Sequence, residues 1–350
     1  MTLDILKVIT PPVLTFFIGI AVTPLFTKYF YKYKMWKKSP RSESGTINDF
    51  IDIHNTAHEL STPRVGGIII WVSVLLTAFS IYLLSIILPN DITTKLSFLS
   101  REQTLIPLAT LVFGSLIGLF DDALQILGRG DYAKDNPAYR KIKILLITII
   151  GLAIGFWFYE KLDMVSIHFP FWRDIYLGVW FVPFFILVML ATFSTSVIDG
   201  IDGLAGGVLA SIFGAFAVIA FVHNQIDISA FSGSITGGIL AFLWFNIPPA
   251  RFYMGETGML GLTITLSVIA FLTNSSLILP IIALPLVATS FSVIVQIFSY
   301  KFRNGKRVFR LAPLHHHFQA IGWSREKVVM RYWVLSTVFA AIGVVIALIG

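Results

Sequence analysis

The chain contains ten apolar stretches of about 20 residues, the length that an α-helix needs to cross the hydrocarbon core of a bilayer. Each stretch is too long and too evenly apolar to be one of the alternating strands of an outer-membrane barrel. Only 13% of the 350 residues are charged, against about 25% in soluble proteins, which excludes a soluble globular enzyme and a nucleic-acid-binding domain. We therefore predict an all-α, polytopic integral membrane protein that forms a single transmembrane domain over 1–350. The expected spans are 10–32, 65–88, 104–122, 143–159, 176–197, 204–222, 231–247, 257–273, 277–298 and 328–349.

The positive charges are distributed unevenly between the two sets of loops that these spans define. Of the 26 Lys and Arg residues, 21 lie in the loops after spans 1, 3, 5, 7 and 9, and 5 lie on the opposite side. Because cytoplasmic loops carry the positive excess, we expect these odd-numbered loops in the cytoplasm and both termini outside it. The first span has no basic leader, so we expect it to remain as a signal anchor.

Most of the chemically reactive side chains fall on the side that these charges mark as cytoplasmic. The segments expected to line an active site there are 33–64, 121–142, 198–203, 246–256 and 299–327. The chain has no cysteine, so thiolate nucleophiles and thiolate metal sites are excluded. A site assembled from several cytoplasmic loops accounts for the clustering. The candidate residues are Asp121, Asp122, Asp199, Asp202, Asn246, Glu256, His54, His58, His315, His316 and His317.

Two acidic motifs indicate phosphate or metal chemistry. Asp121 and Asp122 follow the apolar run TLVFGSLIGLF, where adjacent carboxylates are costly unless they are paired, hydrated or bound to a cation. They are candidates for magnesium ligands or for a base acting on a phosphate; the alternative is a helix that simply ends in water. In VIDGIDGLAGG, Asp199 and Asp202 share one face of a helical turn, beside glycines and a helix N-terminus that suit phosphate. The alternative there is a tight Asp-Gly turn between two helices.

Two further segments supply oxygen and nitrogen donors. In NIPPARFYMGETGMLGL, Asn246 and Glu256 are oxygen donors of the kind that magnesium prefers, and a surface turn is the alternative. In RLAPLHHHFQAIGW, successive helical residues turn by about 100°, so at most two of His315, His316 and His317 converge on one point. The basic setting favours recognition of an anion or a sugar over a zinc site. An exposed histidine run is the alternative.

Five segments occur together in an order that resembles a known family. They are TPRVGG, FDD, DGIDGLAGG, N-x-x-P-A-x-x-x-M-G-x-T-G and PLHHHF followed by GW, and they extend over about residues 60–335. Together they resemble the polyprenyl-phosphate N-acetylhexosamine-1-phosphate transferases. The resemblance implies ten membrane helices in the bacterial inner membrane, with an active site open to the cytoplasm. It also implies Mg²⁺ as cofactor, undecaprenyl phosphate as acceptor and a UDP-sugar as donor, with UMP released, and it is compatible with a homodimer.

Matching the motifs residue by residue gives the roles that this resemblance implies. The implied catalytic residues are Asp121, Asp122, Asp199 and His316, and the implied magnesium ligands are Glu256 and Asp121. The implied substrate-binding residues are Lys143, Asp202, Asn246, His315 and His317. Lys143 and magnesium would neutralise the two anionic substrates, so that the acceptor phosphate attacks the sugar-linked phosphorus directly. A covalent intermediate on Asp121 or Asp122 is the alternative.

Four positions depart from the family pattern or divide its branches. Glu256 stands where an aspartate is usual, Ser196 where an asparagine is usual, and Gln125 where a lysine is usual. PLHHHF resembles the branch of peptidoglycan synthesis, whose donor is UDP-N-acetylmuramoyl-pentapeptide and whose product is lipid I. TPRVGG, with Arg64, resembles the branch that takes UDP-N-acetylglucosamine. We expect the first donor and keep the second as the alternative; a membrane transporter, the remote alternative, would carry charges near the mid-plane.

Overall fold

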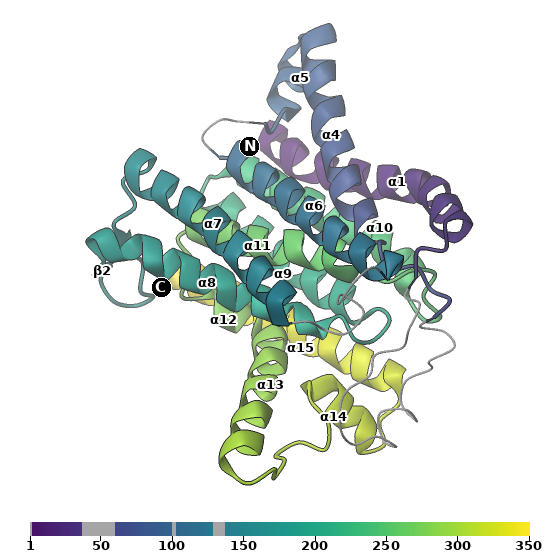
Figure 1. Ribbon diagram of the computed structural model, residues 1–350. Coiled ribbons are helices and arrows are strands. Elements are labelled where there is room, and N and C mark those ends of the chain that lie inside the picture. Colours follow the sequence, from purple (N-terminus) through teal and green to yellow (C-terminus); the bar gives the residue numbers. More distant parts are fainter. Residues whose placement is uncertain (1, 37–59, 100–102, 129–136) are drawn as a thin grey trace.

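The computed structural model describes residues 2–36, 60–99, 103–128 and 137–350. Ten helical segments in these ranges are long and apolar enough to cross a membrane, which confirms the polytopic all-α fold (Figure 1). The spanning helices are α1 (Thr2–Lys32), α4 (Ile68–Ile87), α6 (Leu105–Leu127), α7 (Pro137–Lys161), α8 (Phe181–Ser194, flanked by η2, Gly178–Trp180, and η3, Thr195–Ile198), α9 (Leu204–Val222), α10 (Ile226–Asn246), α11 (Gly255–Leu272), α13 (Leu284–Phe302) and α15 (Arg325–Ile349).

The shorter elements divide between the two ends of the helix bundle. An antiparallel pair of strands, β1 (Ser166–Ile167) and β2 (Ile175–Tyr176), joins α7 to α8, and α5 (Asp91–Leu96) follows α4. Ten spans return the chain to the side on which it started, so both termini lie on the side of these two elements. The short helix α14 (Leu314–Ala320) lies on the opposite side (Figure 1).

The first, third and ninth spans differ most from the predicted ranges. α1 begins at Thr2 and not at residue 10. The third was expected to end at residue 122, but α6 continues to Leu127 and ends at Gly128, whose φ of 59° is left-handed. Asp121 and Asp122 are therefore inside the helix and only 6% and 1% exposed, and the alternative of a helix ending in water is wrong. The ninth span is divided at Ala283 into α12 (Leu279–Ile282) and α13, each with a proline in its first turn.

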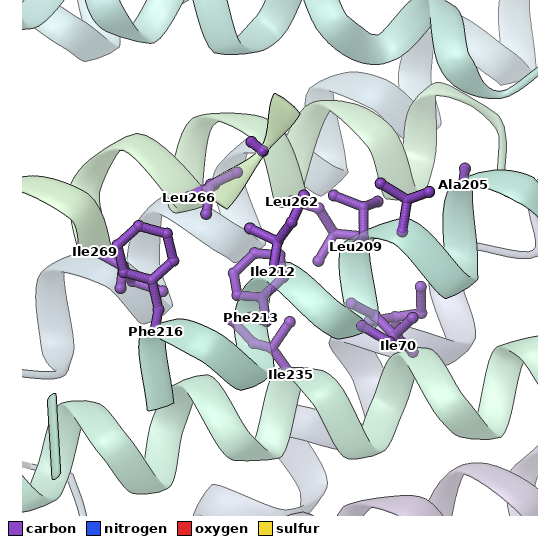
Figure 2. Close-up of a cluster of buried hydrophobic side chains, with 14 of the residues drawn as sticks. Ile70, Ala205, Leu209, Ile212, Phe213, Phe216, Ile235, Leu262, Leu266 and Ile269 are labelled. Atoms are coloured by element: carbon purple, nitrogen blue, oxygen red, sulfur yellow. The ribbon is translucent and has the colours of Figure 1, made fainter. Parts of the chain in front are cut away.

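Three central helices, α9, α10 and α11, form the core that positions the site. α11 is almost wholly enclosed and packs against α6 and α8, while α10 packs between α1 and α9. Because lipid is as apolar as leucine, helix association in a bilayer depends on close packing. Gly118 of α6 lies directly on the Glu256 backbone, which brings the acidic end of α6 to the first turn of α11. The apolar contacts behind this junction include Leu209, Ile212, Phe213, Phe216, Ile235, Leu262, Leu266 and Ile269 (Figure 2).

Candidate active site

The buried carboxylate of Asp122 caps the first turn of α11. Its Oδ2 atom accepts hydrogen bonds from the Thr257 backbone N–H at 2.8 Å and from the Thr257 hydroxyl at 2.7 Å. A carboxylate at a helix N-terminus is stabilised by the unpaired N–H groups and by the helix dipole. Asp122 Oδ1 is also buried, and it has no hydrogen-bond partner among the described residues. One oxygen of Asp122 is thus fixed by α11, and the other remains available to a ligand.

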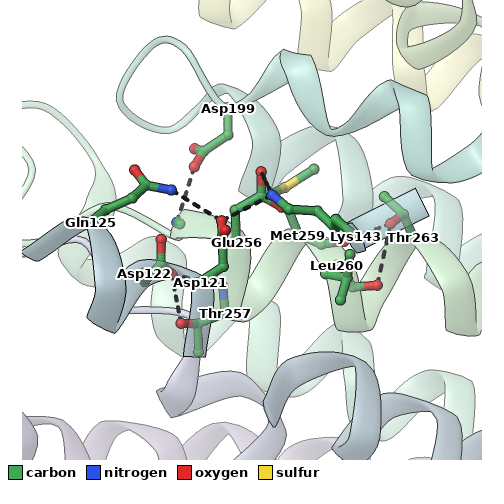
Figure 3. A network of polar contacts seen from close by, with 11 residues as sticks. Asp121, Asp122, Gln125, Lys143, Asp199, Glu256, Thr257, Met259, Leu260 and Thr263 are labelled. Carbon is green, nitrogen blue, oxygen red and sulfur yellow. Dashed lines mark hydrogen bonds and ion pairs between the residues drawn. The ribbon is translucent and has the colours of Figure 1, made fainter. Parts of the chain in front are cut away.

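Lys143 forms the centre of an ion-pair network that joins three helices (Figure 3). Its Nζ atom lies 2.9 Å from Asp121 Oδ2 on α6 and 3.1 Å from Glu256 Oε1 on α11. Gln125 Nε2 donates a further hydrogen bond of 3.0 Å to Asp121 Oδ2. The three charged side chains are 8 to 24% exposed, so water screens the charges only partly. The structure thus brings together three residues that the sequence assigned to phosphate and metal binding.

The Asp-Gly loop approaches the same junction from the other side. Asp199, just after η3, accepts a hydrogen bond of 3.1 Å at Oδ2 from the Gly255 backbone N–H. Asp202 Oδ2 accepts one of 3.2 Å from the Ala250 backbone N–H. Asp202 therefore bonds to the segment between α10 and α11, and Asp199 bonds to the first residue of α11, next to Glu256. A simple Asp-Gly turn would not require these two bonds to a distant segment.

Asn246 connects the loops on the two sides of this junction. Its Oδ1 accepts a hydrogen bond of 2.9 Å from the Gly203 N–H, and its Nδ2 donates one of 2.8 Å to the Phe252 carbonyl. The side chain is buried, and both ends of its amide are bonded to backbone. The sequence indicated Asn246 as a substrate-binding oxygen donor; in the structure it ties the Asp-Gly loop to the segment before α11.

Two of the three histidines face the Asp-Gly loop. His315 and His316 are buried on α14 with ring centroids 4.2 Å apart. A Cβ added at Gly200 would lie 2.5 Å from His315 Nε2 and 3.0 Å from His316 Nε2, so a larger residue there would displace the two rings. His316 Nδ1 also bonds Gln319 Oε1 at 2.8 Å. Two converging rings agree with the limit that helical geometry sets.

His317 points to a different neighbourhood. Its Nδ1 accepts a hydrogen bond of 3.2 Å from the Arg310 N–H, and its ring packs on Phe309. Partial burial and the charge of Arg310 lower the pKa of His317 below its ordinary value, which favours the neutral ring. Of the other predicted residues, His54 and His58 lie outside the described residues, as do parts of segments 33–64 and 121–142.

Sequence reasoning missed two residues of this site. Thr257 was part of a quoted motif, yet nothing in its type indicated that it bonds the buried acid on α6. Arg64 was noted only as a mark of one family branch. In the structure its side chain is 9% exposed and lies within electrostatic range of Asp122, and its buried Nε has no hydrogen-bond partner among the described residues. The available signal was an arginine directly before an apolar membrane span; the structure shows it buried, and an arginine is almost never fully buried without a partner.

The donor set fits a divalent cation that is completed by substrate. Within the described ranges, no group of three or more His, Cys, Asp or Glu side chains could hold a metal on its own. Two buried carboxylate oxygens, Asp122 Oδ1 and Glu256 Oε2, nevertheless have no hydrogen-bond partner among the described residues. Magnesium is commonly bound by one or two carboxylates together with substrate phosphates and water. The site therefore has the chemistry for such an ion without a complete protein cage.

Comparison with known proteins places this geometry in a class. The model of Glycosyl transferase family 4 matches residues 104–274, the part of the chain from α6 to the end of α11. The fold and this match together indicate a multi-pass membrane protein of the glycosyl transferase class.

Relatives over nearly the full length identify the family. A phospho-N-acetylmuramoyl-pentapeptide-transferase of Geobacillus sp. (strain WCH70) is 33% identical over 339 residues, 95% of this chain and 96% of its own. Proteins of the same name from Caldanaerobacter subterraneus subsp. tengcongensis and Pelagibacter ubique are 33% and 32% identical, covering 95% and 93% of this chain and 96% and 89% of their own. The chain belongs to the phospho-N-acetylmuramoyl-pentapeptide-transferase family. The resemblance drawn from the motifs is confirmed, and the transporter alternative falls away.

Proposed function

We propose that the protein transfers phospho-N-acetylmuramoyl-pentapeptide from its UDP donor to undecaprenyl phosphate, giving lipid I and UMP in peptidoglycan synthesis. The observation that carries the proposal is the packing of His315 and His316 on Gly200. This packing sets the histidine segment on the Asp-Gly loop, whose Asp199 bonds the Gly255 N–H next to Glu256 of the Lys143 network. The names of the relatives support the same donor.

The reaction follows from the charges at the site. An oxygen of undecaprenyl phosphate attacks the sugar-linked phosphorus, and the bond from this phosphorus to the UMP oxygen breaks as the new P–O bond forms. Lys143 attracts the donor diphosphate and offsets charge that moves to the leaving oxygen. The acceptor phosphate is already ionised near neutral pH, so no strong base is required. Direct transfer therefore needs no covalent intermediate on Asp121 or Asp122.

Magnesium dependence is part of the proposal. Asp122 and Glu256 would hold the ion through their unbonded buried oxygens, with Asp121 beside them in the Lys143 network. When bound, Mg²⁺ supplies positive charge that brings the two anionic substrates together. The long apolar helices give the polyprenyl chain a lipid-facing surface, which explains why the reaction takes place in a membrane.

Donor profiling tests the proposed function. With purified protein and undecaprenyl phosphate, we expect UMP release from UDP-N-acetylmuramoyl-pentapeptide and little from UDP-N-acetylglucosamine. His316→Ala should lower that release at least about tenfold, or about 1.4 kcal/mol of barrier, because it removes a ring that faces the Asp-Gly loop. His317→Ala should cost less, because His317 bonds Arg310 instead.

The matched control for these variants is His223→Ala, since His223 is exposed at the opposite end of α9. Efficient turnover of the N-acetylglucosamine nucleotide, with the muramoyl-peptide nucleotide ignored, would overturn the donor assignment. It would also show that TPRVGG, with Arg64, predicts the donor better than PLHHHF does.

The orientation of the protein is a separate prediction. We propose that it lies in the bacterial inner membrane with the site facing the cytoplasm, because 21 of 26 Lys and Arg residues lie on that side. A reporter fused after Gly350 should therefore read as extracytoplasmic. The same reporter inserted at Asn304, in the exposed turn after α13, should read as cytoplasmic. The reverse pattern would contradict the proposal, since UDP-sugars are cytoplasmic.

Glu256 should determine the metal requirement. Glu256→Asp keeps the charge but shortens the side chain, so we expect turnover to persist at a shifted magnesium concentration. Glu256→Gln keeps the length but loses the charge that faces Lys143, and it should lose turnover about 100-fold. Magnesium titrations of UMP release, with paramagnetic titration of Mn²⁺ binding, distinguish the two variants. A Gln variant with wild-type magnesium dependence would show that Glu256 is not a ligand.

A further inference from the structure

Gly203, at the end of the Asp-Gly loop, is held through both of its peptide groups. It has a left-handed φ of 78°, and its N–H donates to Asn246 Oδ1 at 2.9 Å. Its carbonyl accepts a hydrogen bond of 3.0 Å from the indole Nε1–H of Trp333, on the last helix of the bundle. The Gly207 N–H donates to the same carbonyl at 3.3 Å. Four segments thus meet at one residue that follows Asp202 directly.

The remaining contacts of Trp333 explain a second glycine of the motif. The pyrrole edge of its indole lies on Gly207, so that a Cβ there would overlap Nε1. About one turn further along α15, Ser336 Oγ donates a hydrogen bond of 3.2 Å to the carbonyl of Val208, the residue after Gly207. α15 is therefore bonded along the N-terminal part of α9, and Gly207 gives the indole access to the Gly203 carbonyl.

The direction of two site carboxylates depends on this fixed point. Asp199 and Asp202 reach the Gly255 and Ala250 N–H groups through bonds of 3.1 and 3.2 Å, which are long for a carboxylate. Glycine has more accessible backbone conformations than any other residue, so loss of one of the bonds at Gly203 would loosen the loop that carries both carboxylates.

We propose that Trp333 is a positioning residue of the active site: its indole N–H fixes the Gly203 carbonyl and thereby the orientation of Asp199 and Asp202. The expected effect of Trp333 on turnover rests on the proposed function, whereas its effect on the order of the Asp-Gly loop does not. Trp333 lies in the apolar run of α15, far in sequence from each of the acidic motifs. The last helix thus takes part in the site without presenting a side chain to substrate.

We call the hydrogen bond from the Trp333 indole N–H to the Gly203 carbonyl the clamp. Hydrogen exchange of the ligand-free protein tests the clamp without any assay of function. Trp333→Phe keeps an aromatic ring but removes the N–H donor. We expect the amides of residues 203–207 to exchange at least about tenfold faster than in the wild type. The matched control is Trp244→Phe, because Trp244 is 67% exposed on α10; it should leave the exchange of this segment unchanged.

Turnover provides the second measurement. Trp333→Phe should lower kcat for UMP release about tenfold with KM for the UDP donor changed less than about twofold. The melting temperature should stay within about 3 °C of the wild type. A purely structural role for Trp333 would lower the melting temperature and leave the kcat of the folded fraction unchanged.

Gly207→Ala is the second variant, for the case that Trp333→Phe does not fold. Its added Cβ displaces the indole, so it should produce the same faster exchange at residues 203–206. Gly214→Ala is its control on the same helix, because a Cβ there meets no described atom within 4 Å. Unchanged exchange in the folded Trp333 variant, or in Gly207→Ala, would overturn the clamp. Absence of UMP release from the wild-type protein would overturn the proposed function instead, and exchange would still decide the clamp.

Discussion

Asp122→Asn is expected to lower UMP release about 1,000-fold, equivalent to about 4 kcal/mol of activation free energy, while the protein still folds. The substitution is nearly isosteric. The Asn oxygen still accepts the Thr257 N–H and hydroxyl, which are 2.8 and 2.7 Å from Asp122 Oδ2. The change falls on the other atom: the buried Oδ1 becomes an NH₂ group that repels a cation and has no acceptor prepared for it.

The magnitude follows from what the charge does. Removal of one preorganised group that stabilises transition-state charge commonly costs about 100-fold to 1,000-fold in rate. Asp122 acts in a buried setting, where an electrostatic interaction is stronger than in water. Loss of the carboxylate should therefore weaken cation binding and transfer together, and titration with Mn²⁺ should show the first effect directly.

Two companion variants and one control complete the test. Asp121→Asn removes a charge that Lys143 contacts, and Asp199→Asn weakens the acceptor of the Gly255 N–H; each should also lose most turnover. Asp174→Asn is the control, because Asp174 is 60% exposed and pairs with His168 at the opposite end of the bundle. Near-wild-type UMP release from all three site variants would refute the assignment of these carboxylates to the reaction.

The membrane spans were predictable because length and apolarity suffice to define them. A helix in lipid satisfies its backbone internally, so each apolar run gives a span, and most of the predicted ends are correct to within a few residues. The exceptions are the start of α1, the break in the ninth span at Ala283 and the end of α6. α6 continues past residue 122 because Asp121 and Asp122 find partners on α7 and α11. Those partners lie 22 and 135 residues away, so the hydropathy of the residues around 122 does not indicate them.

The site was predictable as a set of residues but not as a set of contacts. One-sided clustering of acids and histidines indicated that the loops meet. Side-chain type alone, however, did not show that both ends of the Asn246 amide bond to backbone groups. An asparagine that binds a ligand would look the same in the sequence. Helical geometry limited the converging histidines to two, but only the packing of α14 on Gly200 shows which two. Trp333 was hidden because a tryptophan in an apolar span usually indicates contact with lipid headgroups.

Lys143→Met should have opposite effects on transfer and on cation binding. The ammonium lies between Asp121 Oδ2 and Glu256 Oε1, at 2.9 and 3.1 Å, in a setting with little solvent. Methionine keeps an unbranched chain of similar length and removes the charge. The two carboxylates then face one another without a counter-ion, which is unfavourable when a buried pair loses one partner. We expect the melting temperature to fall, and turnover to fall about 100-fold, since the donor diphosphate loses a cation.

A divalent ion, by contrast, should bind the variant more tightly, because Lys143 no longer repels it and no longer competes for Asp121 and Glu256. Titration with Mn²⁺ followed by paramagnetic resonance measures this affinity without substrate, and UMP release measures turnover. Lys141→Met is the matched control, two residues away on the exposed face of α7, and should alter neither quantity. Lys143→Arg keeps the charge and should retain more turnover than the Met variant. Unchanged turnover in Lys143→Met would remove Lys143 from the phosphate site. Weaker Mn²⁺ binding in the same variant would show that the lysine supports the cation rather than competing with it.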